Sequence, residues 1–443
     1  MMLQEKALKL LQYYPLCDYC LGRQFSNLAT GTTNLSRGKT IKDFLVMDVS
    51  TTLVDDQIQI LQCLSRSGSD LAKKYLVKKE IQAEETMKCY ICEDSLEMVE
   101  ELADLIIPHT EGYEFYTILI GTLIPKSILE RETELKKQHD VTQTELLKQE
   151  FNRNVGKKLS EKLPITTDFK SPEIVIEIDP FTQNINMRIK SLYIYGKYRK
   201  FLRTIPQTRW PCRRCKGKGC DECNNTGKKH LESVEELIEV KAIELAKAEK
   251  ITLHGGGRED IDALMLGTGR PFVFEIVNPR IRSLSLRDLE KKINDFTQNK
   301  VEVLELRWST HKEVVHVKQS AERAVKKYRA LVSFLEPITD ENMVKIEKEF
   351  HNKELQQRTP NRVSHRRADK IREKKVYSIE CTRKDTMEIE MLVRCDGGCY
   401  VKELISGDEG RTKPSISEIT MNSAVCKELD VIEIMEIPYI QEE

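Results

Sequence analysis

The order of apolar and polar residues predicts helices and strands along the whole chain. Residues 173–178 (EIVIEI) and 184–189 (NINMRI) alternate apolar with polar positions, which is typical of strands with one buried face. Helix-like stretches precede them, and the charged segment from Arg131 to Lys157 carries Leu135 and Phe151 at positions that favour an amphipathic helix. We therefore expect a mixed α/β module in the N-terminal part.

The C-terminal half alternates helix and strand patterns. A capping box at residues 233–236 (SVEE) begins a helix that runs to about Glu249. The elements expected after it are a strand over 251–254, a helix over 285–296, a strand over 301–308, a long basic loop and a strand over 388–394. This alternation predicts an α+β fold.

Residues 254–276, HGGGREDIDALMLGTGRPFVFEI, join a run of glycines to an apolar strand. The glycines at 255–257 allow a sharp turn or a close approach to a ligand. Arg258 to Asp260 then place a guanidinium beside carboxylates, and a carboxylate held near a cation stays ionised and can act as a nucleophile or a base. These residues fit either a catalytic loop or a tight turn that carries surface charges.

Three motifs in order resemble those of pseudouridine synthases. GRED at 257–260 is similar to their Gly-Arg-x-Asp active-site motif, KKYRA at 326–330 to Lys-x-Tyr-x-Ala, and GGCYVKEL at 397–404 to a Tyr-[Val/Ile]-[Lys/Arg]-x-Leu strand. The blocks SLYIYGKYRKFLRTIPQTRWPC, QQRTPNRVSHRRAD and ISGDEGRTKPS extend the similarity over nearly the whole chain. The chain thus resembles the archaeal-type tRNA pseudouridine synthases of the Pus-ten family, which act on the T loop. This implies a catalytic domain with an extended mixed sheet.

The resemblance also implies a chemistry. Pseudouridine formation breaks the N-glycosidic bond of uridine, turns the uracil and rejoins it through carbon, so it needs a carboxylate near the anomeric carbon and a pocket for the detached base. The motif assigns the carboxylate to Asp260. Asp262 is the local competitor, and we interpret it as a group that bonds within the loop or caps a helix. No organic cofactor is needed for this reaction.

The resemblance assigns the remaining pocket residues by motif. Tyr328 would stack on the uracil, Lys402 would keep the nucleophile ionised, and Leu404 would form a wall of the pocket, with Tyr400 beside them. Arg258 would hold the target nucleotide open, because the base must leave its stack to reach the pocket. Tyr328 and Leu404 fit equally well as core residues.

The cysteines gather in pairs spaced for metal binding. Eight of the 13 cysteines lie in CxxC pairs, and the long chain has no export signal, so a disulfide framework is not expected. Residues 212–227 form two tandem CxxCxxxG repeats, whose glycines let backbone amides turn toward sulfur. Four thiolates suit a structural zinc ion, and reduced or redox-active thiols are the alternative. The expected ligands are Cys212, Cys215, Cys220 and Cys223.

A second zinc site is expected from two pairs separated by a long insertion. One pair from each end of a small domain commonly closes such a site. Its ligands would be Cys17, Cys20, Cys89 and Cys92. The scattered cysteines are interpreted as small buried side chains.

Two segments concentrate positive charge, although Lys plus Arg and Asp plus Glu number 71 each in the whole chain. The segment from Lys197 to Lys229 contains 11 Lys or Arg residues and two acids. The segment from Lys353 to Lys375 contains nine and three, and includes the run HRR at 365–367. Such runs are either solvated faces or phosphate contacts. Beside a candidate RNA-modifying site we interpret them as contacts to the T arm of tRNA, with Arg366 and Arg367 as binding residues.

Length and a further resemblance suggest the domain organisation. Residues 155–180, VGKKLSEKLPITTDFKSPEIVIEIDP, resemble the end of a THUMP domain, an RNA-binding module. A chain of 443 residues with 40% hydrophobic residues can form two or three domains with real cores. We expect a zinc-binding, THUMP-like tRNA-binding domain over 1–200 and a catalytic domain over 201–443 that carries the cysteine segment 212–223.

The sequence also limits where the protein is expected in the cell and which other functions it could have. The start, MMLQEKALKLLQYYPLC, lacks a signal pattern, and no apolar run approaches the roughly 18 residues of a membrane span, so we expect a cytoplasmic protein. A non-catalytic tRNA-binding protein is one rival. A THUMP-linked thiolase or methyltransferase is another, but the nucleotide-binding glycine fingerprint it needs is missing. No obligate protein partner is evident, and both the oligomeric state and the choice between tRNA positions 54 and 55 stay open.

Overall fold

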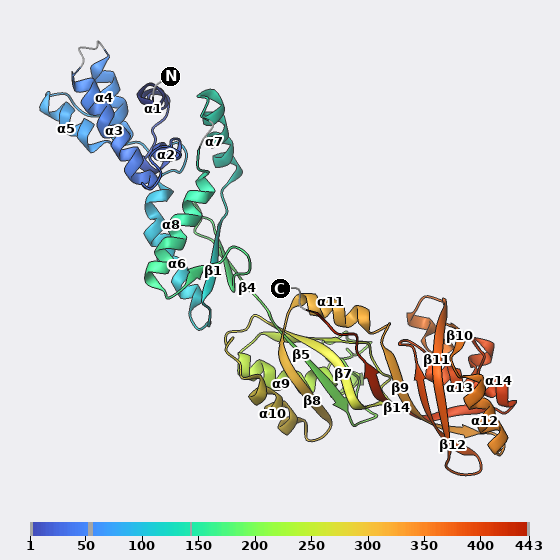
Figure 1. Cartoon of the computed structure of the whole chain (residues 1–443). Helices are drawn as coiled ribbons and strands as arrows, with labels where there is room; N and C mark the ends of the chain where they lie inside the picture. Colours follow the sequence, from blue (N-terminus) through green and yellow to red (C-terminus); the bar gives the residue numbers. More distant parts are fainter. Residues whose placement is uncertain (1–2, 52–55, 142–143, 441–443) are drawn as a thin grey trace. The chain divides into compact units, whose positions relative to one another are not determined.

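The computed structural model describes residues 3–51, 56–141 and 144–440 and divides the chain into two compact units, Met1–Lys190 and Ser191–Glu443 (Figure 1). The division therefore falls before β5 (Leu192–Lys200) and not after residue 200, where the sequence pattern places it. The reason is strand pairing, because β5 forms its ladders with β7 (Leu264–Val277) and β8 (Val301–Ser309) of the second unit.

The first unit combines helices with a four-stranded sheet of order β2-β1-β3-β4, in which β1 runs parallel to β2 and β3 and β4 runs antiparallel to β3. Its elements are α1 (Leu3–Tyr13), α2 (Asp18–Arg23), α3 (Asn34–Thr51), α4 (Gln57–Arg66), α5 (Asp70–Lys78), α6 (Val99–Thr110), β1 (Thr117–Thr122), α7 (Lys126–Gln138), α8 (Leu147–Lys162), β2 (Thr166–Thr167), β3 (Ile174–Ile178) and β4 (Ile185–Ile189). Both predicted strands are confirmed. The charged segment is not one helix, because α7 ends at Gln138 and α8 starts at Leu147.

Apolar side chains from the helices and from β1 and β3 form one core in this unit. Leu135 of α7 and Phe151 of α8 are fully buried in it, which explains why so charged a segment is helical. Two glycines let α2 and α3 approach backbone to backbone. A Cβ on Gly22 would overlap the carbonyl of Asn34, and a Cβ on Gly38 would overlap that of Asp18.

The second unit contains a ten-stranded mixed sheet of order β13-β10-β11-β12-β9-β14-β7-β5-β8, with β6 paired to β7. Its remaining elements are α9 (Val234–Ala246), β6 (Lys250–Gly255), α10 (Leu286–Thr297), α11 (His311–Ser320), β9 (Val325–Phe334), α12 (Asp340–Glu349), β10 (Lys353–Arg358), β11 (Ile371–Arg383), β12 (Glu388–Cys395), α13 (Val401–Ser406), β13 (Thr412–Lys413), α14 (Ile416–Thr420) and β14 (Ala424–Met435). The predicted α+β class with an extended mixed sheet is confirmed.

Local signals fix several of these elements. The hydroxyl of Ser233 accepts a hydrogen bond from the amide of Glu236 at 3.3 Å, which is one of the two bonds of the predicted capping box, and it donates a different bond to the Glu236 carboxylate at 2.7 Å. Ser285 caps α10 by accepting a hydrogen bond from the amide of Asp288. The segment expected to be a long basic loop before the last strand is not one continuous loop. Its residues 353–358 belong to β10 and its residues 371–375 to β11.

Two large cores lie along the large sheet. α9 and α10 cover the part around β5, β7 and β8, while α12, α13 and α14 cover the part around β9 to β12 (Figure 1). Tyr328 of β9 packs against both cores, so the KKYRA motif lies where the two parts of the sheet meet. In the described part of the chain, every helix is too short or too polar to cross a membrane.

Candidate active site

A pocket of about 150 Å³ opens in the second unit between the two cores. Segments far apart in the sequence line it: the glycine loop after β6, the start of β9, the turn into α13, and the segment after β10. Its charged and tyrosine lining residues are Arg258, Glu259, Asp260, Arg270, Lys326, Tyr328, Arg362, Arg367, Tyr400 and Lys402. All three sequence motifs therefore reach one cavity.

Glu259 anchors the glycine loop through buried hydrogen bonds. Its side chain is 6% exposed, and its carboxylate accepts hydrogen bonds from the Tyr198 hydroxyl at 2.9 and 3.0 Å and from Arg270 Nε at 2.8 Å. Arg270 also donates to the carbonyl of Gly256 at 2.9 Å, and Gln207 donates to that of Gly257 at 2.9 Å. Glu259 is the middle residue of the Arg-Glu-Asp triplet. Because it is held in place by these bonds, its neighbours Arg258 and Asp260 are positioned to line the pocket.

Asp260 lies half-buried in the pocket between two cations. Its Oδ2 is 2.8 Å from Arg362 Nη1 and 3.7 Å from Lys402 Nζ. Lys402 is closer to Asp262, at 2.7 Å. Burial raises the pKa of the Asp262 carboxyl, but the hydrogen bond and charge of Lys402 and the charge of Arg362 together hold that pKa below its usual range. The cation expected to face Asp260 therefore shares its charge between both carboxylates.

Arg362 is a site residue that the motif analysis missed. It bridges Asp260 to the buried carboxylate of Glu403, which accepts from Arg362 Nε at 2.6 Å. Burial lowers the pKa of Arg362, but the Glu403 and Asp260 carboxylates together raise it by more than burial lowers it. The side chain therefore stays protonated. Its only signal in the sequence is its place in the block QQRTPNRVSHRRAD.

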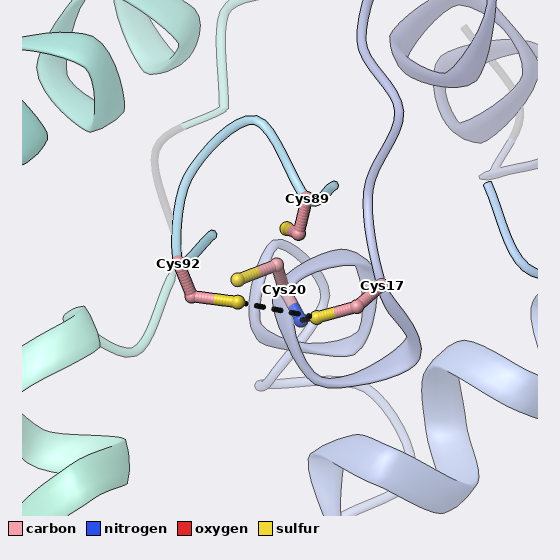
Figure 2. A group of neighbouring side chains, drawn as sticks. All are labelled: Cys17, Cys20, Cys89 and Cys92. Carbon is pink, nitrogen blue, oxygen red and sulfur yellow. Dashed lines mark hydrogen bonds between the residues drawn. The ribbon is translucent and has the colours of Figure 1, made fainter. Parts of the chain in front are cut away.

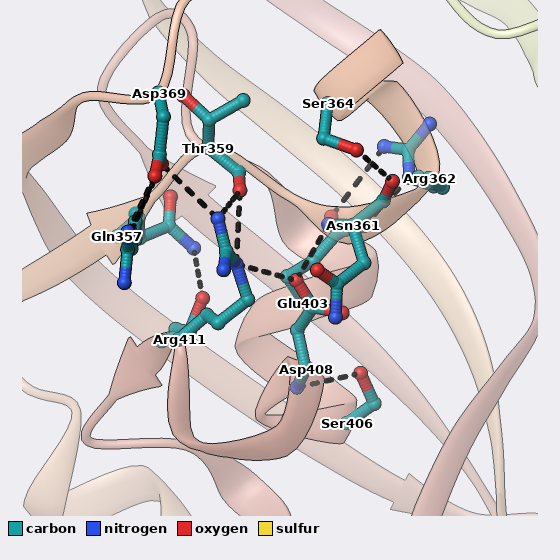
Figure 3. A network of polar contacts seen from close by, with 12 residues as sticks. Gln357, Thr359, Asn361, Arg362, Ser364, Asp369, Glu403, Ser406, Asp408 and Arg411 are labelled. Carbon is teal, nitrogen blue, oxygen red and sulfur yellow. Dashed lines mark hydrogen bonds and ion pairs between the residues drawn. The ribbon is translucent and has the colours of Figure 1, made fainter.

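A polar network fixes the segment that carries Arg362 (Figure 3). Arg411 donates to the carbonyl of Thr359 at 2.7 and 3.0 Å and pairs with Asp369 at 3.1 Å, so both ends of the segment are tied to one guanidinium. The amide of Asn361 donates to Asp408 at 3.0 Å. The basic segment is thus an ordered element of the site.

The third motif is a helix and not the strand that the resemblance implies. The amide of Leu404 donates to the carbonyl of Tyr400 at 2.9 Å, which closes a helical turn, and Gly407 ends it in the left-handed region at φ +82°. The helical repeat turns Lys402 toward the pocket and buries Leu404 fully in the core. Leu404 is therefore a core residue and is not among the lining residues.

The other predicted residues reach the pocket. Tyr328 and Tyr400 line it, and burial raises the pKa of the Tyr328 phenol, so this ring stays neutral. Arg258 is exposed at the rim, with its guanidinium 5.6 Å from the centre of the Trp210 ring. Arg367 lines the pocket as well. The side chain of Arg366 lies outside the described residues.

Most cations of the segment from Lys197 to Lys229 are paired within the protein. Arg199, Arg203 and Arg209, for example, form ion pairs with glutamates. The exceptions include four exposed side chains of the cysteine segment, to which the described residues offer no hydrogen-bond or ion-pair partner. These are Arg213, Arg214, Lys216 and Lys218.

Two clusters of four cysteines could each hold a metal ion, because the sulfur atoms in each lie within 4.8 Å of one another. Figure 2 shows the first cluster, buried between α2 and the segment before α6, with the sulfurs of Cys17 and Cys92 3.5 Å apart. In the second, amides of Gly219 and Gly227 donate to Cys215 and Cys223, both at 3.2 Å. The amide-to-sulfur bonds expected from the CxxCxxxG repeats are present.

Comparisons with known proteins agree over nearly the whole chain. Residues 193–435 match the family "Pus10, C-terminal", and residues 102–179 match "Pus10 THUMP domain, archaeal". A tRNA pseudouridine synthase Pus10 of Methanothrix thermoacetophila is 41% identical over 434 residues, which cover 98% of this chain and 94% of that protein. The protein of the same name from Methanocaldococcus jannaschii is 42% identical over 435 residues, covering 96% and 93%.

The likeness to solved structures is weaker. The crystal structure of a Cbf5-Nop10-Gar1 complex shares 19% sequence identity over 45% of each chain, with a TM-score of 0.29, and carries no argument. The assignment depends instead on the two matched domains and on sequence identity along nearly the full length of relatives. By these matches the chain belongs to the Pus10 family.

Proposed function

We propose that this protein converts uridine to pseudouridine in the T loop of tRNA, at position 54, position 55 or both, with Asp260 as the nucleophile. The observation that carries the proposal is the pocket itself. It places the Asp260 carboxylate 2.8 Å from Arg362 and 3.7 Å from Lys402, and the ring of Tyr328, which can stack on a base, lines the same cavity.

In this mechanism Asp260 attacks the anomeric carbon of the flipped uridine, and the uracil leaves with the electrons of the glycosidic bond. Arg362 and Lys402 hold the carboxylate in position and compensate its charge. Tyr328 stacks on the free uracil while it turns, and Tyr400 lines the same cavity. The uracil carbon then displaces the carboxylate, and Asp260 is regenerated.

The rim of the pocket suits a nucleotide that has left its stack. Arg258 is exposed there against the ring of Trp210, so a flat aromatic surface and a guanidinium stand where neighbouring bases and phosphates would lie. Phosphate contacts would come from Arg367 and from the unpaired cations of the cysteine segment. The THUMP domain would supply a further contact to tRNA.

Both cysteine clusters fit structural zinc. Sulfur atoms around a tetrahedral zinc ion lie about 3.8 Å apart when each Zn–S bond is about 2.3 Å. The sulfurs of Cys17 and Cys92 are 3.5 Å apart, three sulfur pairs of the second cluster are 3.7 to 3.9 Å apart, and all four sulfurs of each cluster lie within 4.8 Å of one another. Four sulfur ligands leave no open position for a reacting group, so zinc would stabilise these segments and take no part in the chemistry.

The test is Asp260→Asn, with Asp262→Asn as the matched control in the same loop. Each variant is incubated with an unmodified tRNA transcript, and pseudouridine is mapped at single-nucleotide resolution. Because the amide keeps the shape but is not a nucleophile, we expect no product from D260N, near-normal tRNA affinity, and product from D262N at the wild-type position. Turnover by D260N at the wild-type rate would refute the assignment.

A further inference from the structure

Lys326, the first residue of the KKYRA motif, has an unusual position in the pocket. It belongs to the start of β9 and is only 6% exposed, yet it lines the cavity that Asp260 and Tyr328 also line. Among the described residues, no hydrogen bond or ion pair to its side-chain amine is found. Because buried polar groups are normally hydrogen-bonded, this amine on the cavity wall is available to a group that binds in the pocket.

The charged groups around Lys326 do not neutralise it. Arg270 of β7 and Lys374 of β11 repel its charge, Glu259 of the glycine loop is already held by Arg270 and Tyr198, and the remaining neighbour is the Cys395 thiol of β12. Burial first, and Arg270 next, lower the pKa of Lys326 to about 7. Near neutral pH such an amine can accept a proton and give it back.

The reaction requires such a transfer. Once the carbon C5 of uracil is joined to the anomeric carbon, C5 still carries its hydrogen while N1 has none. The product has the reverse arrangement, so one proton must leave C5 and one must arrive at N1. These two atoms are both bonded to C6, so a single group at that edge of the ring can reach both.

We propose that Lys326 is a further catalytic residue, whose amine contacts the uracil ring and moves the proton from C5 to N1. The inference deepens the proposed function, since it presumes the chemistry at Asp260. The neutral amine removes the C5 proton, and the electrons of that C–H bond restore the C5–C6 double bond and move charge onto N1. The ammonium then protonates N1 and returns to the neutral amine, so no other reactant is consumed.

The first experiment compares Lys326→Met with Lys327→Met. The two lysines are neighbours on β9, so their side chains point to opposite faces of the sheet, and Lys327 is not a lining residue. In single turnover with saturating tRNA transcript, we expect K326M to be slower than wild type by about 10²- to 10⁴-fold, the usual contribution of a general acid–base group. K327M should react at the wild-type rate.

Deuterium at C5 of the target uridine adds a readout that a structural role would not change. In K326M the removal of the C5 hydrogen becomes slow, so deuterium should slow this variant further. A K326M rate equal to that of K327M, with D260N inactive, would overturn the lysine assignment and leave the proposed function standing. An active D260N would instead refute the proposed function.

A second measurement uses the wild-type protein and does not depend on how K326M folds. The single-turnover rate should rise with pH through the pKa of Lys326, near 7, because the neutral amine is the active form. A rate that falls as pH rises through this range would overturn the proposal, since the ammonium would then be the active form. In K326A, added ethylamine should restore part of the lost rate, and no restoration would count against the proposal.

Discussion

Replacing Glu259 with glutamine tests how the catalytic loop is anchored. In the described part of the chain, its carboxylate is the only one that forms an ion pair with the Arg270 guanidinium, at 2.8 Å, and both side chains are almost completely buried. Glutamine keeps the size of the side chain and can still accept from the Tyr198 hydroxyl. The variant therefore leaves a buried cation without its counter-charge.

The size of the effect follows from burial. Arg270 is 1% exposed, so water does not screen its charge. Breaking a buried ion pair by removing one partner costs about 3–5 kcal/mol, and the hydrogen bonds that glutamine keeps favour the lower end. In a unit of this size each kcal/mol lowers the melting temperature by about 2–4 °C, so E259Q should melt roughly 6–12 °C below wild type.

Calorimetry is the assay, and Glu302→Gln is the matched control. Glu302 pairs with Arg199 at 3.0 Å, but the two side chains are 34% and 35% exposed. Such pairs contribute about 0.2–1 kcal/mol, so E302Q should melt close to wild type. If E259Q and E302Q melt at the same temperature, the buried pair does not anchor the loop. E259Q should also lose turnover, because Asp260 follows directly in the chain.

Three further outcomes are expected. Arg362→Ala should slow single turnover by about 10²-fold, as the loss of one precisely placed charged donor does, and an unchanged rate would mean that its 2.8 Å contact to Asp260 has no role. Protein purified without added metal should contain one zinc ion for each of the two cysteine clusters, as measured by elemental analysis, and freely titratable native thiols would exclude both sites. Replacing Arg366 and Arg367 with alanine should weaken tRNA binding and flatten its salt dependence by about 0.9 in logarithmic slope per lost phosphate contact, whereas an unchanged slope would make these residues a solvated surface.

The sequence determined by itself what depends on neighbouring residues. Alternation predicted β3 and β4, the capping box predicted the start of α9, and the CxxCxxxG repeats predicted amides directed at sulfur. The three motifs identified Asp260, Tyr328 and Lys402, which the fold brings to one pocket. Each of these signals acts within about one turn or one strand, where backbone geometry limits the outcomes.

The tertiary structure decided which distant groups meet. Arg362 comes closer to Asp260 than Lys402 does, because Glu403 and the network around Arg411 hold its segment over the pocket, 102 residues away along the chain. Leu404 is buried in the core because residues Val401 to Ser406 form a helix. The motif likewise does not show that the amine of Lys326 has no hydrogen-bond or ion-pair partner among the described residues. Such contacts depend on how strands pair across the large sheet, and no local pattern specifies that pairing.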